Sequence, residues 1–414
     1  MPTTACTEID IADIIRRKQV VTYQQPIVSI TRQAIIGMET LSRGIDAGGD
    51  MISPLRLFQR ATREGMIIPL DRLCRRRALE SFAPVQQQCL DKFISINLDS
   101  SIIDQGIVGS GHVRDLVRTL CIDPHRVVIE IIESRVNDLN ALASFVAIHK
   151  AYGFMIALDD FGSGHSNMER IPIIKPDILK LDRMIISGID REYYKQEVVK
   201  SLVRLAKKIG ALVIAEGVER EEEVLACLEF GVDMFQGFYF ARPQPFDHPL
   251  PVTAHTRLHA IAERFKTTVV ERIRERKTRH QQYEAILQRL LKDLVKMSLA
   301  DADARLAEMI QCNTAIECLY VLDENGVQLT ETVCDCAKMP VTKRLIFSPA
   351  PKGADHSLKD YFLFLNAGLL KYTSDLYISS ASGNPCFTIS AMATMHGVKR
   401  CILCVDFNPD YLAK

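Results

Sequence analysis

Short apolar runs alternate with helical segments over about the first 240 residues of this 414-residue chain. Between most of the apolar runs, hydrophobic residues recur three or four positions apart, which predicts helices. Such alternation is typical of a parallel sheet covered by helices, and eight strands are the number that closes into a barrel. We therefore predict an α/β fold with a TIM-type (β/α)8 barrel; a doubly wound open sheet is the alternative. The predicted strands lie at residues 20–28, 35–41, 93–98, 127–132, 154–158, 178–181, 211–215 and 232–236.

Polar side chains gather where the predicted strands end. In a (β/α)8 barrel the catalytic residues lie at the carboxyl ends of the strands, whereas the strand interiors fill the core. Seven consecutive strands bring oxygen or amine groups to this one edge, which solvated strand tips do not explain. The residues expected at this edge are Glu39, Arg43, Asn97, Glu130, Glu133, Asp159, Asp160, Lys180, Asp182, Glu216, Glu219 and Gln236.

The centre of the expected site is the pair Asp159 and Asp160, which ends an apolar run and precedes a loop rich in Gly and Ser. Two charges at the end of a buried strand are costly unless a cation neutralises them. A turn in which an aspartate side chain bonds to the backbone accounts for only one of them. With Glu39, Asn97 and Glu130 the pair forms a set of oxygen donors, and this set suits Mg²⁺ or Mn²⁺ rather than Zn²⁺.

The same residues suggest phosphoryl transfer to water. A carboxylate such as Asp159 that bridges two ions about 4 Å apart would clamp both oxygens of the displacement. Lys180 would orient or deprotonate the attacking water, and a plain salt bridge to Asp182 or Asp160 is the alternative. Arg43 suits a phosphate or a guanine edge because its guanidinium makes paired contacts. Amides for contacts with a base are offered by Gln25 and Gln236.

The composition limits the partners. Lys plus Arg and Asp plus Glu both total 51, so bulk charge does not favour a nucleic-acid polymer or a membrane surface. No apolar run approaches the ~20 residues of a membrane helix, and the N-terminus lacks a signal-peptide pattern, so we expect a cytoplasmic protein without a membrane span. The 12 cysteines are scattered and expected to be reduced; Cys401 and Cys404 would face opposite sides of a strand and chelate poorly.

The alternation stops at Pro251, and residues 255–298 show one long helical pattern that predicts a connecting, dimerising helix. Its arginines and lysine between 272 and 279 interleave with glutamates, which favours a solvated face over nucleic-acid binding. Strands near 318–323, 376–380, 386–395 and 399–407 then predict a small α+β unit. The expected domains are a barrel at 1–250, a helical linker at 251–310 and a regulatory domain at 311–414.

Seven motifs, in this order and spacing, resemble the EAL-domain family of bacterial cyclic di-GMP phosphodiesterases over about residues 8–250. The resemblance implies a TIM-type barrel whose first strand is antiparallel to the others. It also implies hydrolysis of cyclic di-GMP to linear pGpG with Mg²⁺ or Mn²⁺, most readily as two ions. The motifs are ETLSR at 39–43, IN at 96–97, ExxE at 130–133, DDFGSG at 159–164, LKLD at 179–182, AEGVE at 215–219 and QGFYFARP at 236–243.

Carried onto this chain, the resemblance assigns a role to most of the residues at the strand ends. Lys180 matches the lysine that acts on the nucleophilic water, and Glu219 matches the glutamate that holds the loop after the paired aspartates. Gln236 matches a residue near the water and the substrate, and Glu39 is both a ligand and a catalytic residue. The implied metal ligands are Glu39, Asn97, Glu130, Asp159, Asp160 and Glu216.

Two departures from the family pattern bear on activity. Thr40 stands where the family name has Ala, a change in a side chain expected to point away from the ligand. Ser163, His165 and Asn167 stand where many members have Thr, Tyr and Ser, which affects the loop. Because some relatives are non-catalytic cyclic di-GMP receptors, that function is the alternative, although every ligand position is filled here.

The C-terminal region more weakly resembles PAS-like or Cache-type sensor domains, through Tyr-Val-Leu-Asp at 320–323 and the stretch from Tyr377 to Cys386. This resemblance implies a regulatory domain that binds an unidentified small ligand or mediates a homodimer.

Overall fold

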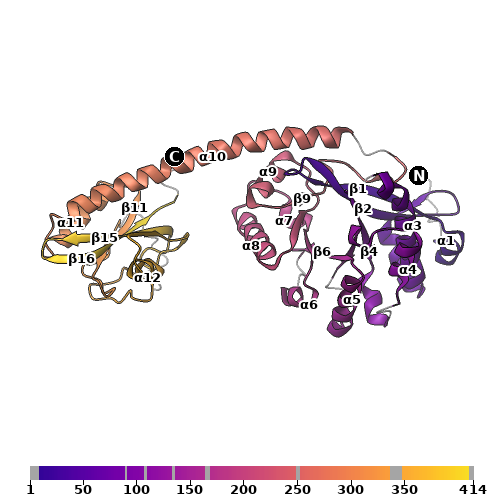
Figure 1. The fold of residues 1–414 in the computed structure, drawn as a ribbon, viewed down its shortest axis with the longest axis horizontal. Coiled ribbons are helices and arrows are strands. Elements are labelled where there is room, and N and C mark those ends of the chain that lie inside the picture. Colours follow the sequence, from indigo (N-terminus) through magenta and orange to yellow (C-terminus); the bar gives the residue numbers. More distant parts are fainter. Residues whose placement is uncertain are drawn as a thin grey trace, which may run out of the picture. The chain divides into compact units, whose positions relative to one another are not determined.

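The computed structural model describes residues 9–88, 91–106, 110–132, 136–163, 168–248, 252–335 and 347–409. The chain forms two compact units, Met1–Val269 and Val270–Lys414. The first unit is a barrel surrounded by helices and the second contains a smaller sheet (Figure 1).

Among the described residues, eight strands close into a barrel in the first unit. β1 is antiparallel to both of its barrel neighbours, β2 and β9. The other neighbouring barrel strands are parallel. The predicted TIM-type barrel with an antiparallel first strand is therefore confirmed, and the open-sheet alternative is wrong. The barrel strands are β1 (Val20–Ser29), β2 (Ala34–Ile45), β4 (Phe93–Leu98), β5 (Val127–Ile131), β6 (Met155–Phe161), β7 (Ile178–Leu181), β8 (Leu212–Ala215) and β9 (Met234–Phe235).

Helices lie around the outside of the barrel (Figure 1). Local signals set their ends: α5 begins after Asp138, whose carboxylate accepts hydrogen bonds from two backbone N–H groups, and α8 ends at Gly210 with φ 78°. These helices are α1 (Ile11–Arg17), α2 (Pro54–Arg63), α3 (Ile67–Gln88), α4 (His112–Thr119), α5 (Leu139–Ala151), α6 (Ile171–Ile174), α7 (Arg183–Ile186), α8 (Tyr193–Ile209) and α9 (Glu221–Phe230). Shorter pieces are β3 (Met51–Ile52), β10 (Gln244–Pro245), η1 (Ser100–Gln105), η2 (Pro124–Arg126) and η4 (Met168–Arg170).

The inside of the barrel has an apolar layer and a polar layer. Six strands each contribute one buried apolar side chain to a small interior cluster. Side chains two positions apart on a strand face the same side, so a polar residue two positions away also points inward. In the antiparallel β1 the polar residue precedes the apolar one. The pairs are Gln25 with Ile27, Val128 with Glu130, Ala157 with Asp159, Ile178 with Lys180, Ile214 with Glu216 and Met234 with Gln236.

The second unit is built on an antiparallel sheet in the order β12-β11-β16-β15-β13, with β14 paired to β15. One face packs against the last turns of the long helix α10 (Val252–Leu294) and against α11, and the other packs against α12. Cys401 belongs to the first of these cores and Cys404 to the second, which confirms that they face opposite sides. The elements are α11 (Ala302–Gln311), β11 (Ile316–Leu322), β12 (Val333–Cys334), α12 (Asp360–Asn366), β13 (Lys371–Thr373), β14 (Tyr377–Ile378), β15 (Pro385–Met395) and β16 (Val398–Phe407).

The predicted long helix is α10 (Val252–Leu294). Leu258 and Ile261 near its start belong to the core of the first unit, whereas Leu287 and Leu290 near its end belong to the core of the second. The helix is therefore a structural part of both units. None of the described helices combines the length and the apolarity that crossing a membrane requires.

Candidate metal centre

Lys180 lies among four carboxylates inside the barrel. Its Nζ atom is 2.6 Å from Glu216 Oε1, 2.9 Å from Glu130 Oε1, 3.0 Å from Asp159 Oδ1 and 3.9 Å from Glu39 Oε2. The lysine side chain is only 1% exposed. These groups come from different strands, and they meet because each side chain points into the polar layer inside the barrel. The lysine thus links carboxylates from four other strands, which goes well beyond a plain salt bridge.

The electrostatics of this cluster are dominated by burial. Burial raises the pKa of Glu216 to about 8, an effect that Lys180 opposes and Asp159 reinforces. Burial and the neighbouring Glu39 raise the pKa of Glu130 well above its ordinary value. Burial disfavours the ammonium of Lys180, yet the surrounding carboxylates raise its pKa well above the ordinary value. One lysine faces an excess of negative charge, so further cations would stabilise the ionised site.

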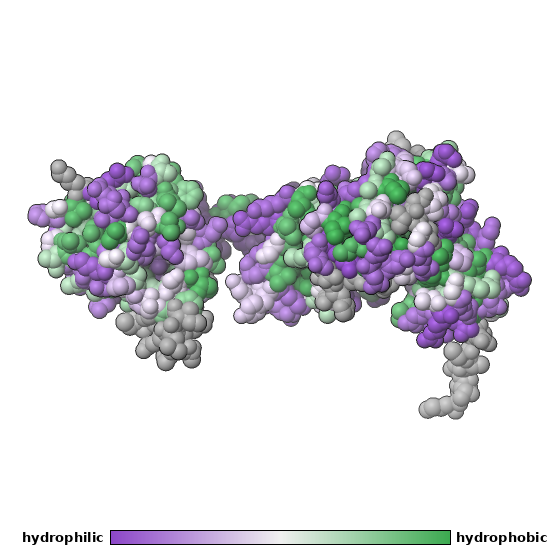
Figure 2. Space-filling model, turned by 90° about the horizontal axis from the view of Figure 1, so that it is seen from below, coloured by the Kyte–Doolittle hydropathy of each residue, from purple (hydrophilic) through white to green (hydrophobic). Residues whose placement is uncertain are grey.

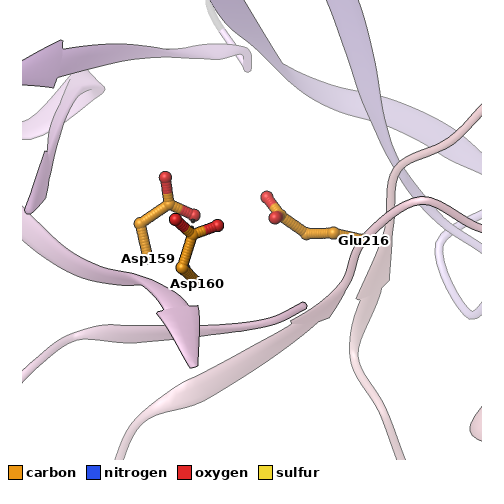
Figure 3. Close-up of side chains that lie close together, drawn as sticks. All are labelled: Asp159, Asp160 and Glu216. Atoms are coloured by element: carbon orange, nitrogen blue, oxygen red, sulfur yellow. Dashed lines mark hydrogen bonds between the residues drawn. The ribbon is translucent and has the colours of Figure 1, made fainter. Parts of the chain in front are cut away.

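The paired aspartates owe their common direction to a β-bulge. Between the β6–β7 pairs Leu158–Leu179 and Phe161–Leu181, β6 has one residue more than β7. Asp160 has φ 55°, in the left-handed region that few residues other than glycine adopt. In a regular strand, adjacent side chains would face opposite sides. Here both carboxylates point toward that of Glu216 (Figure 3). One oxygen from each of these three groups lies within 4.8 Å of the others, a spacing that fits a metal ion.

Glu39 is held by amides from two other strands. Asn97 Nδ2 donates to Glu39 Oε1 at 2.9 Å, and Gln236 Nε2 donates to Glu39 Oε2 at 2.5 Å. Gln236 Nε2 also donates to Gln25 Oε1 at 3.0 Å. Although burial opposes it, Lys180 and these hydrogen bonds lower the pKa of Glu39 below its ordinary value. The two glutamines, expected to contact a base, are therefore placed where they orient this carboxylate.

Two buried acceptors at the site have no hydrogen-bond partner among the described residues: Glu130 Oε2 and Gln236 Oε1. A buried oxygen without a partner is costly, and a bound cation would remove that cost. The other oxygen of Glu130 accepts a hydrogen bond from Ser95 Oγ at 2.5 Å. Ser95 was not among the predicted site residues, although it lies two positions before Asn97 and so faces the same side. The donor set fits a divalent cation that prefers oxygen ligands.

Thr40 explains how the altered family motif is accommodated. Its side chain is 4% exposed, and its Oγ1 donates to the carbonyl oxygen of Ser95 at 2.7 Å. The hydroxyl therefore bonds to the neighbouring strand β4, while Glu39 points to Lys180 in the carboxylate cluster. This agrees with the expectation that Thr40 points away from the ligand.

Three residues of the expected site lie at its margin. Arg43 is half-buried, with its guanidinium 5.4 Å from the centre of the Tyr23 ring. Glu219 is partly exposed, and its Oε2 is 3.0 Å from Arg183 Nη2. Asp182 is the N-cap of α7, and it accepts a hydrogen bond from the backbone N–H of Met184 at 2.7 Å. Glu133, His165 and Asn167 lie outside the described residues.

A pocket of about 570 Å³ opens beside Glu39 and Asn97. Its walls are largely apolar and include Leu41 from β2 and Phe58 from α2. A pocket of this size that combines apolar walls with polar side chains is typical of a small-molecule site. The carboxylate cluster therefore borders a space large enough for an organic substrate.

Known proteins share this architecture. Residues 9–243 match the family model described as EAL domain. PdeB of Escherichia coli K12, a probable cyclic di-GMP phosphodiesterase, is 28% identical over 233 residues, which are 56% of this chain and 44% of PdeB. YkuI of Bacillus subtilis 168, an uncharacterized EAL-domain containing protein, is 27% identical over 383 residues, which are 90% of this chain and 91% of YkuI.

Two solved structures are similar to this chain in fold as well as in sequence. The crystal structure of YkuI in complex with the substrate cyclic di-GMP and calcium has a TM-score of 0.80 at 26% identity, and covers 98% of this chain and 100% of that chain. A manganese and cyclic di-GMP complex of Klebsiella pneumoniae BlrP1 has a TM-score of 0.50 at 25% identity, and covers 59% of this chain and 58% of that chain. Together with the barrel and its carboxylate cluster, these matches place the chain in the EAL-domain family.

Proposed function

We propose that this chain hydrolyses cyclic di-GMP to linear pGpG with divalent metal ions. The observation that carries the proposal is the buried group of carboxylates around Lys180, which borders a pocket of about 570 Å³. In the YkuI and BlrP1 structures, relatives bind cyclic di-GMP together with calcium or manganese. This chain spans less than half of PdeB, so its activity is inferred from its own site as well as from relatives.

We infer two Mg²⁺ or Mn²⁺ ions, held by six residues. Asp159, Asp160 and Glu216 have the spacing for one ion, and the unpartnered oxygen of Glu130 supports a further ligand. Asp159 would be a ligand common to both ions. Bound ions would supply positive charge to the phosphate oxygens and make a water more acidic. The proposed ligands are Glu39, Asn97, Glu130, Asp159, Asp160 and Glu216.

The reaction adds water across one phosphodiester. The water oxygen bonds to phosphorus, the bond from phosphorus to the ribose 3′ oxygen breaks, and a proton passes to that oxygen. Lys180 is charged among its carboxylates and so can donate a hydrogen bond that orients the water. Cations bound to the same carboxylates would lower the pKa of Lys180. A lower pKa would favour the neutral amine, which could deprotonate the water instead of only orienting it.

The remaining predicted residues complete the proposal. Arg43 would bind a phosphate or guanine edge, and Gln25 with Gln236 would position Glu39 and contact the substrate. Glu219, paired to Arg183, would hold the loop after the aspartates. Regulation by a PAS-like or Cache-type domain, the domain limits at 250 and 310, the homodimer and the cytoplasmic location stay predictions.

The test is product analysis by chromatography with the full chain, cyclic di-GMP, and either Mg²⁺ or Mn²⁺. We expect pGpG to form, EDTA to abolish its formation, and Asp160→Asn or Lys180→Met to reduce turnover by at least a hundredfold. A matched control is Glu263→Gln, which alters an exposed carboxylate on α10 and should leave turnover unchanged. Binding without turnover in either metal would support the alternative, a non-catalytic cyclic di-GMP receptor.

A further inference from the structure

The second unit contains a pocket of about 470 Å³ that the proposed catalysis does not use. Tyrosines from four different elements line it: Tyr320 of β11, Tyr361 of α12, Tyr372 of β13 and Tyr377 of β14. Asp406 of β16 lines it as well. A volume of this size with aromatic walls is typical of a small-molecule site.

Asp406 is a buried carboxyl group without a cationic partner among the residues that the structure describes. It is 3% exposed, and within the described part of the chain no lysine or arginine forms an ion pair with it. Glu317, 1% exposed, is also without a cation in that part of the chain, and its Oε2 atom has no hydrogen-bond partner there. Burial raises the pKa of Asp406 to about 7; Thr388 opposes this rise and Glu317 adds to it. Two buried carboxyl groups without a counter-charge are costly.

The hydrogen bonds around Asp406 come from neutral hydroxyl groups. Thr388 Oγ1 donates to Asp406 Oδ1 at 2.7 Å, so the single proton of that hydroxyl is used. Tyr377 Oη, 2.6 Å from Thr388 Oγ1, must therefore donate to it. Tyr377 also hydrogen-bonds to Asp406. These hydroxyl groups are neutral and do not balance the charge of the carboxylate, which a cationic ligand would do.

The hydrogen bonds of His356, which also lines the pocket, can be assigned a donor and an acceptor. His356 Nε2 is 2.9 Å from Gln328 Oε1, and that amide is fixed because its Nε2 donates to two backbone carbonyls. His356 Nε2 is therefore the donor. Burial and the nearby Lys359 lower the pKa of His356, so its Nδ1 accepts from Tyr361 Oη at 2.6 Å. The proton of Tyr361 is therefore used, and Tyr320 hydrogen-bonds to its oxygen.

The mouth of the pocket is acidic. Asp355, Asp360 and Asp375 are exposed residues that line it, and Lys359 is the one lysine or arginine among the described lining residues. This excess of negative charge disfavours phosphate-bearing ligands such as nucleotides. It attracts cations toward the buried carboxyl.

We propose that this pocket binds a small organic cation, an ammonium or guanidinium compound whose charged head contacts Asp406 inside the ring of tyrosines. The carboxylate would accept charge-assisted hydrogen bonds from that head, and the tyrosine faces would add cation–π contacts. Because binding is measured without turnover, this proposal and the proposed phosphodiesterase activity can fail independently.

The test is calorimetric titration of the full chain with three cations: 1,4-diaminobutane, agmatine and L-arginine. The neutral control ligand is 1,4-butanediol. We expect at least one cation to bind at least tenfold more tightly than the diol, and Asp406→Asn to weaken that binding by about 10- to 100-fold. Glu324→Gln, a change of an exposed carboxylate outside the pocket, should leave the affinity unchanged.

Tyr372→Ala provides a second variant in case Asp406→Asn does not fold, because Tyr372 is only partly buried and lies on an edge strand. We expect a several-fold loss of affinity from the missing cation–π contact. The proposal is overturned when the diol binds as well as every cation, when none of the three cations binds, or when the folded pocket variants keep the wild-type affinity.

Discussion

Replacing Lys180 by methionine should destabilise the metal-free barrel, because the change leaves several buried carboxylates without their cation. Three carboxylate oxygens lie within 3.0 Å of Nζ and a fourth lies at 3.9 Å. Removing one partner of a buried ionic group costs about 3–5 kcal/mol. For a unit of about 250 residues, each kcal/mol shifts the transition by about 2–4 °C, so we expect a loss of about 6–20 °C.

Divalent ions should reverse much of this effect, because they bring charge to the same carboxylates. A metal ion at a hundred times its Kd adds about 2.7 kcal/mol to the free energy of unfolding. We expect the gain to be larger in the variant, where the ion replaces the missing lysine charge. The sequence has no tryptophan, so differential scanning calorimetry in EDTA and in Mn²⁺ is the suitable assay. Lys208→Met, at an exposed position on α8, is the control and should change stability by less than about 0.5 kcal/mol. Equal transitions for wild type and Lys180→Met in EDTA would refute the reasoning.

Three further outcomes are expected. Gly37→Ala should cost about 1–3 kcal/mol, seen as a lower urea midpoint, because the added Cβ would lie 2.5 Å from the ring of Phe93. Thr40→Ala should cost about 1 kcal/mol through the lost bond to Ser95 but leave kcat within about twofold; a loss of activity would contradict the geometry. Asp406 has a folded pKa of about 7 against an ordinary 3.8, so it favours the folded second unit at low pH, and this contribution is lost as pH rises through 7. Calorimetry at pH 5 and 8 should show a pH dependence of about 2–3 kcal/mol, because the unfolded carboxyl is already largely ionised at pH 5, and Asp406→Asn should remove it; an unchanged dependence in the variant would argue against this assignment.

The barrel was predictable because its signals are local. Each strand is a short apolar run, and the inward-facing polar residues follow from a period of two along the strand. The expected strand at 35–41 is longer in the structure, Ala34–Ile45, because β2 continues as the antiparallel partner of β1. The expected strand at 232–236 is shorter, Met234–Phe235. Strand ends depend on pairing with distant residues, which a local pattern does not contain.

The sequence predicted which residues lie at the site, but it did not predict how their side chains are arranged. The bulge at Asp159 and Asp160 requires a positive φ at an aspartate, and no residue type in that stretch signals it. The contacts of Lys180 with four strands depend on closure of the barrel. Ser95 could have been found from its spacing to Asn97 alone.

The proposed hydrolysis of cyclic di-GMP by the carboxylate cluster and divalent ions can be tested through the origin of the oxygen atom in the product. The most direct measurement is mass spectrometry of the product after incubation of the full chain with cyclic di-GMP and Mn²⁺ in ¹⁸O-labelled water. We expect pGpG that carries one ¹⁸O atom on its terminal 5′ phosphate, and no pGpG in EDTA. Recovery of intact, unlabelled cyclic di-GMP from a protein shown to bind it would rule out hydrolysis at this site.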